Sequence, residues 1–357
     1  MSLLSDLLNW FSRPMPGANN PDVSMPFQLP FQEWIDDTKV PGLAITVLHS
    51  GEKVFQKGYG WADIEGRKPV DPQKTIFRIA SASKPIASMA LAKMVMAGQI
   101  DLDKSFYNYV PYFTKKQSDF TIRQLATHTA GIRGYRGKEY ALNKPYTIKD
   151  SLELFQEDPL LFSPGTGYLY NSFGWVLISL AMEEVSGESF SGYVQKEILN
   201  PLGMNNTLVE VPGEMPEGKA VPYTRFNSGF RPAVPVDNRY KLAGGGYLST
   251  TEDLVKLGTA VLENSLVSPE VMKEFLTPQK INGYSTHYGL GWQVSVDKSG
   301  RPYIGHVGNG VGGYSNFFVY PDDEVVISLL INCTDPKVQP LLDDLVLPPV
   351  LNQLSQR

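Results

Sequence analysis

Ser81 and Lys84 stand three residues apart at the start of an apolar stretch with helical spacing. The apolar residues recur every three or four positions up to Gly98, which predicts a helix over 81–97. Both side chains should lie on one face of its first turn. A hydroxyl beside an amine supplies a nucleophile and an acceptor for its proton, and the free N–H groups of a helix start can stabilise a developing oxyanion. The pair is therefore a candidate for nucleophilic catalysis.

The Ser-x-x-Lys spacing is weak evidence when it stands alone, because a chain of this length should contain roughly one or two such matches by chance. A second match, Ser295 to Lys298, falls in a polar stretch just before Gly300 and indicates a turn. Further motifs are needed to favour the first serine over the second.

The composition is that of a folded protein without the signature of a cofactor or a metal. The 357 residues are 42% hydrophobic and 19% charged, with a net charge of −5, which predicts one large domain or two lobes. No run of lysine or arginine occurs, so we do not expect nucleic acid as a partner. Cys333 is the only cysteine and the histidines are scattered singly, so neither an internal disulfide nor a metal site is predicted.

The order of elements along the chain predicts an α+β fold. Runs of β-forming residues come first and last with helices between them, so both chain ends should share one antiparallel sheet. A capping box from Ser249 to Glu252 should begin a helix that ends at Leu262. The other predicted helices cover 31–38, 81–97, 121–127, 148–156, 171–186 and 189–199, and the predicted strands cover 43–48, 54–61, 289–296, 303–307, 315–320 and 325–331.

We expect one catalytic domain, 31–357, preceded by an N-terminal segment or linker, 1–30. Residues 14–30 contain five prolines, which is typical of an extended linker. The sheet lobe of the domain should comprise about 31–78 and 245–357, flanked by helices, and the helical lobe about 79–244. The start of the chain lacks the basic region and cleavage site of an intact secretory signal, and no stretch approaches the roughly 18 apolar residues of a membrane-spanning helix.

Three later stretches carry a family resemblance when they are combined with the first Ser-x-x-Lys motif. They are LATHTAGI at 125–132, SPGTGYLYNSFGW at 163–175 and GHVGNGVGGY at 305–314. In this order and spacing the motifs resemble the active-site-serine β-lactamase and penicillin-binding-protein superfamily, in particular its class C-like branch of esterases and D-stereospecific peptidases. The resemblance covers roughly residues 31 to 335 and implies a β-lactamase/transpeptidase-like fold. Within the superfamily, segments 158–160, 168–170 and 236–250 are similar to the mitochondrial serine β-lactamase-like proteins and their bacterial relatives.

The resemblance assigns a role to three side chains. It implies that Ser81 is the acylated nucleophile and that Lys84 is its proton partner. Tyr170 would carry a proton between the serine oxygen, the lysine and the leaving group. Which of Lys84 and Tyr170 is the general base stays open at this point.

The resemblance also implies a binding surface along the segment that contains His306. This residue and Gly308 would lie on a strand that lines the site, and the missing side chain of Gly308 would let the substrate backbone approach closely. The backbone N–H of Asn309, together with that of Ser81, would form the oxyanion hole that a tetrahedral intermediate requires.

Two positions depart from the pattern of the superfamily. The asparagine that usually holds a substrate carbonyl two places after the tyrosine is replaced by Ser172, and Asn171 stands one place early. His306 occupies a position at which β-lactamases usually carry lysine. An imidazole is largely neutral at pH 7, so the attraction for a penicillin-type carboxylate should be weaker. Both departures favour a peptidase, amidase or esterase over a β-lactamase.

Three other residues have a structural and a functional interpretation. His128 could serve as a base, but the resemblance puts its loop beneath the helix of Ser81 and favours a structural role. Tyr314 and Trp292 are candidates for the substrate groove or, equally, for the core.

The sequence therefore predicts a serine hydrolase that forms an acyl-enzyme on an ester, amide or peptide, with a small molecule or peptide as its substrate and no metal or cofactor. One alternative is a true β-lactamase or penicillin-binding DD-peptidase. An alternative of another class is a non-catalytic scaffold or filament-forming protein with the same fold, but Ser81, Lys84 and Tyr170 are all retained. Since members of the superfamily act mostly outside the cytoplasm, we expect a bacterial exported protein, periplasmic or membrane-tethered, with a cytoplasmic location as the alternative.

Overall fold

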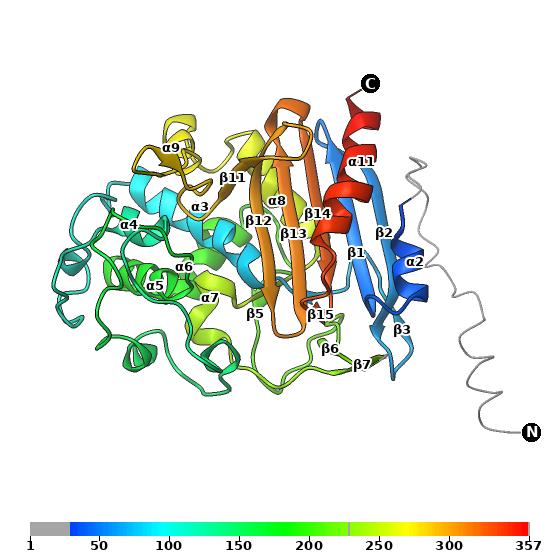
Figure 1. Cartoon of the computed structure of the whole chain (residues 1–357), viewed down its shortest axis with the longest axis horizontal. Coiled ribbons are helices and arrows are strands. Elements are labelled where there is room, and N and C mark those ends of the chain that lie inside the picture. Colours follow the sequence, from blue (N-terminus) through cyan, green and yellow to red (C-terminus); the bar gives the residue numbers. More distant parts are fainter. Residues whose placement is uncertain (1–28, 228, 356–357) are drawn as a thin grey trace, which may run out of the picture.

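A seven-stranded antiparallel sheet forms one half of the molecule, and its strand order is β11-β12-β13-β14-β1-β2-β3 (Figure 1). The computed structural model describes residues 29–227 and 229–355. Both chain ends contribute to the sheet, because β1 pairs with β14 from Leu43 opposite Ile331 to His49 opposite Val325. The expected α+β fold is therefore confirmed. The strands are β1 (Gly42–His49), β2 (Glu52–Asp63), β3 (Lys68–Pro69), β11 (Gln293–Val296), β12 (Pro302–Gly310), β13 (Gly313–Tyr320) and β14 (Val325–Ile331).

The central strands are buried on both faces. Every residue of β13 and β14 is buried, and the sequence of β14, Val-Val-Ile-Ser-Leu-Leu-Ile, is the nearly continuous apolar run that a strand covered on both faces requires. Alternate residues of β14 join two different hydrophobic clusters: Ile327 packs with α2 (Phe31–Asp36) and α11 (Leu347–Leu354), and Val326 packs with α8 (Thr251–Leu262). The sheet is thus the middle layer between two sets of helices.

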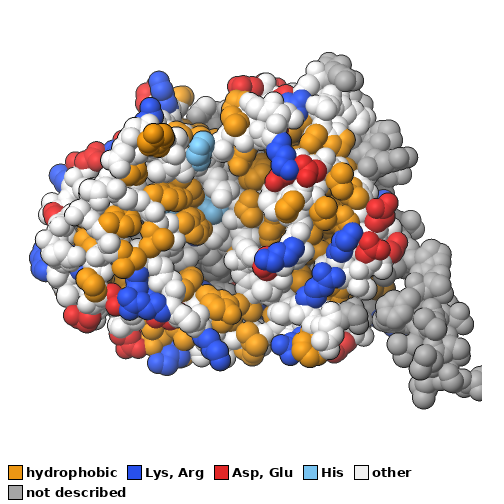
Figure 2. Space-filling model, in the orientation of Figure 1, with side chains coloured by type: hydrophobic (Ala, Val, Ile, Leu, Met, Phe, Trp, Pro, Cys, Tyr) orange, Lys and Arg blue, Asp and Glu red, His pale blue; other side chains and the backbone are white. Residues whose placement is uncertain are grey.

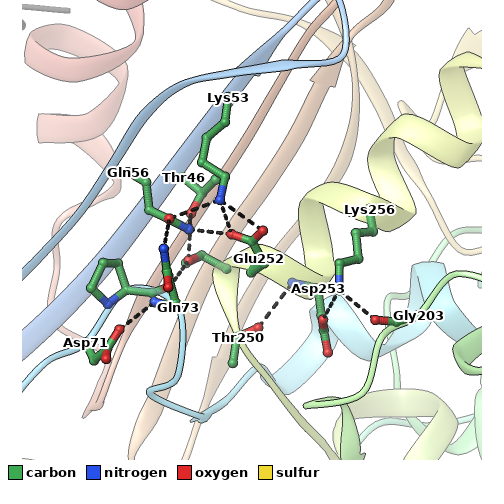
Figure 3. A network of polar contacts seen from close by, with 12 residues as sticks. Thr46, Lys53, Gln56, Asp71, Gln73, Gly203, Thr250, Glu252, Asp253 and Lys256 are labelled. Atoms are coloured by element: carbon green, nitrogen blue, oxygen red, sulfur yellow. Dashed lines mark hydrogen bonds and ion pairs between the residues drawn. The ribbon is translucent and has the colours of Figure 1, made fainter. Parts of the chain in front are cut away.

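Polar contacts fix α8 to the sheet (Figure 3). Glu252 accepts hydrogen bonds from Lys53 at 2.8 Å and from Gln56 at 2.5 Å, and Thr251 Oγ1 lies 2.8 Å from Thr46 Oγ1. The predicted capping box from Ser249 to Glu252 was wrong by one residue. Thr250 is the N-cap and its hydroxyl accepts the N–H of Asp253, and the carboxylate of Glu252 pairs with β2.

The other half of the molecule is mainly helical (Figure 1). Its two longest helices, α3 (Ser83–Met96) and α5 (Phe173–Ser186), are buried along most of their length and confirm the predictions for 81–97 and 171–186 to within two residues at each end. The shorter helices of this half are α4 (Ile122–Ala126), α6 (Phe190–Val194), α7 (Leu242–Gly245) and α9 (Pro269–Phe275), with the single turns η1 (Ala80–Ala82), η2 (Phe106–Asn108), η3 (Glu139–Ala141), η4 (Asp150–Leu154), η5 (Gln195–Leu199) and η6 (Arg239–Lys241). The short elements α10 (Gln339–Leu341), η7 (Pro321–Asp323) and η8 (Leu342–Val346) belong to the half that contains the large sheet.

Short sheets connect the two halves. Strand β4 pairs with β8 immediately before η1 and so fixes the entry of the chain into α3. The strands outside the large sheet are β4 (Phe77–Arg78), β5 (Leu208–Val209), β6 (Tyr223–Phe226), β7 (Gly229–Pro232), β8 (Tyr247–Ser249), β9 (Lys280–Ile281), β10 (Tyr284–Ser285) and β15 (Cys333–Thr334). In the part of the chain that the structure describes, no helix is both long and apolar enough to cross a membrane. Residues 1–28 of the predicted linker lie outside the described residues.

Two predicted elements differ from the structure. The helix expected over 148–156 is only the 3₁₀ turn η4, in which Ser151 Oγ donates to the carbonyl of Ile148 and competes with regular helical hydrogen bonds. The strand expected from residue 289 begins at Gln293, because Gly291 has a φ of +89° and turns the chain against the ring of Trp175.

Candidate active site

Ser81 lies in η1, between β4 and α3, where the helical half meets β12. The preceding residue, Ala80, has a φ of +45°, a left-handed conformation that is unfavourable for alanine. Neighbouring contacts hold this turn: the carbonyl of Ile79 accepts hydrogen bonds from Ser315 Oγ at 2.7 Å and from the N–H of Ala82 at 3.1 Å. The position of the Ser81 hydroxyl is therefore fixed from both the sheet and the helix.

Lys84 lies one turn after Ser81 and is fully buried. Its Nζ is 3.1 Å from Ser81 Oγ and donates to the carbonyl oxygen of Gly244 at 2.6 Å. Burial, with a smaller contribution from the positive charge of Lys241, lowers the pKa of Lys84 to about 7. Near neutral pH the amine of Lys84 is therefore available in its neutral form, and its lone pair can accept the proton of Ser81.

Tyr170 approaches Ser81 from the loop before α5. Its hydroxyl donates to Ser81 Oγ at 2.8 Å, and its ring centroid is 4.8 Å from Lys84 Nζ. Although 38% of the residue is exposed, the burial around its hydroxyl raises the pKa of Tyr170 above its usual value, so the phenol stays protonated at neutral pH. The three residues expected to act together are thus within hydrogen-bonding distance of one another through Ser81 Oγ.

Gly308 brings β12 against the backbone of Ser81. A Cβ atom on Gly308 would lie 2.4 Å from the carbonyl oxygen of Ile79 and 2.9 Å from the nitrogen of Ser81, so only glycine permits this approach. On the neighbouring residue of β12, the N–H of Val307 donates to Gln293 Oε1 on the side of β11. Because N–H groups alternate along a strand, the N–H of Asn309 points toward that same side, beyond the last residue with which β11 pairs.

The side chain of Asn309 is exposed, and its Oδ1 accepts the N–H of Asp335 at 3.0 Å. The oxygen of the Asn309 side chain is thus turned to Asp335, while its backbone N–H points to the side of β11. Figure 2 shows that the surface is hollowed between the helical half and β12, in the region of this strand and of the start of α3.

His306 is buried beside the site, and both of its ring nitrogens already have partners. Nδ1 is 2.7 Å from the carbonyl oxygen of Val307, so it carries the proton, and Nε2 accepts the hydroxyl of Tyr288 at 2.9 Å. Burial, with the charge of Lys84, lowers the pKa of His306 to about 3. The imidazole is thus neutral, and it is held by the protein in an arrangement that leaves neither nitrogen free for a substrate carboxylate.

Asn171 has a different role from the expected contact with substrate. Its Oδ1 accepts the N–H of Gly174 at 2.7 Å and its Nδ2 donates to the carbonyl of Leu169, so the side chain stabilises the start of α5 rather than reaching Ser81. Ser172 is partly buried, and it opposes the rise in the pKa of Tyr135 that burial causes. The structure thus brings Ser172 to the edge of the site without the amide that the superfamily usually supplies.

The three residues with two interpretations, His128, Trp292 and Tyr314, are all buried. The ring of His128 packs 4.5 Å from that of Tyr170, and its Nδ1 accepts the N–H of Asn171. Trp292 is fully buried and donates to Ser88, and Tyr314 packs in the cluster beneath α11. In residues 29–227 and 229–355, no three histidine, cysteine, aspartate or glutamate side chains form a group that could hold a metal ion.

Two site residues were missed by the sequence argument, Tyr288 and Lys241. Tyr288 is buried and contacts the rings of His128, Tyr170 and His306. Lys241 belongs to a segment, 236–250, that showed a resemblance but gave no reason to single out the lysine. No local pattern distinguishes a buried lysine from a solvated one, so only its tertiary neighbours could have revealed it.

Known proteins resemble this chain over most of its length. The sequence profile of the beta-lactamase family matches residues 30–348. The human serine beta-lactamase-like protein LACTB, mitochondrial (Homo sapiens), is 30% identical over 391 residues, which cover 81% of this chain and 70% of that protein.

Solved structures of related proteins have the same fold. The octameric penicillin-binding protein homologue from Pyrococcus abyssi superposes with a TM-score of 0.78 at 26% identity, over 90% of this chain and 75% of that one. The D-amino acid amidase from Ochrobactrum anthropi SV3 has a TM-score of 0.78 at 21% identity, over 88% and 95% of the two chains, and so shares the fold.

Proposed function

Because the chain belongs to the beta-lactamase family, which is part of a superfamily of serine hydrolases, we propose that it hydrolyses an ester, amide or peptide through an acyl-enzyme on Ser81. The observation that carries this proposal is the position of Ser81 Oγ, 3.1 Å from Lys84 Nζ and 2.8 Å from the hydroxyl of Tyr170. A nucleophile, a proton acceptor and a proton donor meet there at one oxygen atom.

The protonation states favour Lys84 as the general base. The lowered pKa of Lys84, about 7, leaves a neutral amine available near neutral pH, whereas the raised pKa of Tyr170 keeps its phenol protonated. In the resting state Tyr170 then donates to Ser81 Oγ, and the hydroxyl of Ser81 donates to the lone pair of Lys84. This arrangement supports the proposal that Lys84 is the general base and Tyr170 the general acid.

The proposed reaction has two steps, acylation of Ser81 and hydrolysis of the acyl-enzyme. Ser81 Oγ bonds to the substrate carbonyl carbon while its proton passes to Lys84, and the backbone N–H groups of Ser81 and Asn309 stabilise the oxyanion. The bond to the leaving group breaks as that group takes the proton of Tyr170, and the proton held by Lys84 restores the phenol. Water releases the acyl group by the same steps in reverse order, which regenerates the hydroxyl of Ser81 and yields the acid.

The neutral state of His306 supports a substrate without an anionic group at β12. Its ring nitrogens are bound to Val307 and Tyr288 and its pKa is lowered to about 3, so this position offers no cation to the carboxylate of a penicillin. We therefore favour a peptidase, amidase or esterase activity over that of a true β-lactamase or DD-peptidase.

Covalent labelling tests the proposal. The protein is incubated separately with a fluorescent fluorophosphonate and a fluorescent penicillin, and the modified residue is mapped by mass spectrometry. We expect fluorophosphonate on Ser81, weaker labelling by the penicillin, and loss of both in Ser81→Ala with unchanged circular dichroism. The matched control is Ser295→Ala, which removes the serine of the other Ser-x-x-Lys match and should label normally. Labelling that persists in Ser81→Ala would show that another residue is the nucleophile.

The cellular location is a separate part of the proposal. We favour export from a bacterial cytoplasm, to the periplasm or to a membrane surface, since members of the superfamily act mostly there. Fractionation of the source cells, with antibodies against the folded domain, tests it. Recovery of the protein with cytoplasmic markers alone would contradict export.

A further inference from the structure

Lys241 is a second buried lysine near the nucleophile, and it carries its ammonium without a carboxylate partner. Only 6% of the residue is exposed. Its Nζ donates to the carbonyl oxygen of Tyr140 at 2.7 Å and lies over the rings of Tyr135 and Tyr240, 5.2 and 5.5 Å from their centroids. Among residues 29–227 and 229–355, no aspartate or glutamate forms an ion pair with it. A buried ammonium in such surroundings projects its charge onto its neighbours, because water does not screen it.

One short segment connects Lys241 to Lys84. Lys241 is the last residue of η6, which leads directly into α7, and Gly244 of α7 accepts the hydrogen bond of Lys84 Nζ. Gly244 also packs on Ser172, whose Cβ is 3.2 Å from a Cβ placed on the glycine, and the ammonium of Lys241 lies over the ring of Tyr135. The segment that orients the amine beside Ser81 thus also fixes the second lysine.

Lys241 is the charged group that acts on Lys84. The other titratable neighbours of Lys84 carry no charge at neutral pH: the pKa values of His128 and His306 are lowered by burial, and the pKa of Tyr170 is raised by burial. The pKa of Lys84 itself is lowered first by burial and then by Lys241.

Lys241 has charged neighbours of its own. Burial and then Arg78 lower the pKa of Lys241 to about 8, and Asp237 opposes them. Arg78 is paired with Glu210 and Asp237 with Arg239. Neither of these pairs contributes to the pKa shift of Lys84.

We propose that Lys241 is a positioning residue of the hydrolase, whose charge keeps the proton off Lys84 and so leaves the amine beside Ser81 free to accept the proton of the nucleophile. This inference rests on the proposed function. Burial lowers the pKa of both lysines, and the pKa of Lys84 is lowered further, to about 7, than that of Lys241, to about 8, so Lys241 is the more readily protonated of the two. β-Lactamases usually carry a lysine at the position of His306, on β12. This chain has no positive charge there, and Lys241 of η6 supplies one near Lys84 instead.

The pH dependence of fluorophosphonate labelling tests the inference. In Lys241→Met the like charge is gone, so Lys84 keeps its proton to higher pH. The acid limb of the pH profile, over which the labelling rate rises as Lys84 loses its proton, should therefore move to higher pH by roughly half a pH unit or more. At pH 6 this is a loss of about threefold or more relative to the parent. Lys241→Arg keeps the charge, so its acid limb should stay at or below that of the parent.

The matched control is Lys116→Met. Lys116 is a half-buried lysine of the helical half that, like Lys241, donates to backbone carbonyls, those of Gln156 and Asp158, but it does not act on Lys84. Its acid limb should be that of the parent. A merely structural role of Lys241 would lower the labelling rate equally at all pH values in both Lys241 variants, and an unshifted limb in Lys241→Met, or an upward shift in Lys241→Arg, would overturn the inference.

A titration without turnover separates this inference from the proposed function. Lysine labelled with ¹³C at Cε is introduced into Ser81→Ala, the Lys84 signal is assigned with Lys84→Arg, and its titration is followed by NMR with and without Lys241→Met. We expect the midpoint to rise by the same half unit or more when Lys241 is replaced, even if the parent labels nothing. An unchanged midpoint would refute the role of Lys241 whatever the activity of the enzyme. Thermal melting of each variant verifies that it is folded.

Discussion

The contact between Gly308 and the turn that carries Ser81 predicts a large effect from one methyl group. In Gly308→Ala the new Cβ would lie 2.3 Å from Ser315 Oγ, 2.4 Å from the carbonyl oxygen of Ile79 and 2.9 Å from the nitrogen of Ser81. An unstrained contact needs about 3.5 Å, so β12 and η1 must separate by about 1 Å. Ser315 could rotate away, but the two backbone atoms could not, so replacing Ser315 as well should not restore activity.

A displacement of about 1 Å at the reacting atoms can cost roughly 100-fold in rate. We therefore expect the fluorophosphonate labelling rate of Gly308→Ala to fall by about 100-fold, while overpacking lowers the free energy of unfolding by about 1–3 kcal/mol. The rate is measured by in-gel fluorescence over time, and the stability by urea unfolding, at a temperature where both proteins are folded.

Gly310→Ala is the matched control, because it adds a methyl group to the same face of β12. Its Cβ would lie 3.1 Å from the Cβ of Ala80, a side-chain contact that a shift of a few tenths of an ångström relieves. Its labelling rate should stay within a few fold of the parent. A Gly308→Ala protein that labels as fast as Gly310→Ala would refute the reasoning that the approach of β12 to Ser81 sets the activity.

Four further predictions concern single groups of the site. Tyr170→Phe should lower kcat/KM for an unactivated ester or amide by about 10²- to 10⁴-fold, because the leaving group loses its proton donor; a loss of less than tenfold in steady-state assays would assign the acid elsewhere. In the parent, kcat/KM should rise with pH and reach half of its maximum near pH 7, as Lys84 with its pKa of about 7 loses its proton; a rate that is flat from pH 5 to 9 would contradict Lys84 as the base. Asn171→Ala removes the acceptor for the N–H of Gly174 and should lower the free energy of unfolding by about 1 kcal/mol, as measured in urea; an unchanged free energy would contradict the role of Asn171 at the start of α5. Neutral p-nitrophenyl esters should be turned over with a higher kcat/KM than nitrocefin, because His306 is neutral; the reverse order would restore the β-lactamase interpretation.

The sequence allowed prediction of those parts of the fold that depend on local periodicity. The apolar spacing after Ser81 and the run of β14 were sufficient to predict a helix and a strand, since each is buried along most of its length. The C-terminal helix α11 was not predicted, because Pro348 and Pro349 look like helix breakers although prolines are tolerated in a first turn. The prediction of a helix over 148–156 was wrong, because side-chain hydrogen bonds such as that of Ser151 stabilise a 3₁₀ turn there instead of a regular helix.

In the site, too, the residues that belong to local motifs could be predicted, and those that depend on tertiary contacts could not. Ser81, Lys84 and Tyr170 were named from the motifs, and the structure brings them together. Lys241 could not be named, because its burial depends on Tyr135 and Tyr140, about 100 residues earlier in the chain. The environment of His306 was likewise hidden, since Tyr288 comes from the loop before β11 and no spacing links the two residues.

The pairing of β1 with β14 has a consequence for biosynthesis. Leu43 and its partner Ile331 are 288 residues apart in the chain, and at about 5 to 20 residues per second a ribosome needs about 15 to 60 s to make the second strand after the first. For most of that time the residues of α3, preceded by Ser81, have been made, but those of β12, with Gly308 and Asn309, have not. On the proposed mechanism, a nascent chain therefore carries Ser81 without the strand proposed to stabilise the oxyanion, and we expect it to be inactive until its own C-terminal strands have been made and paired.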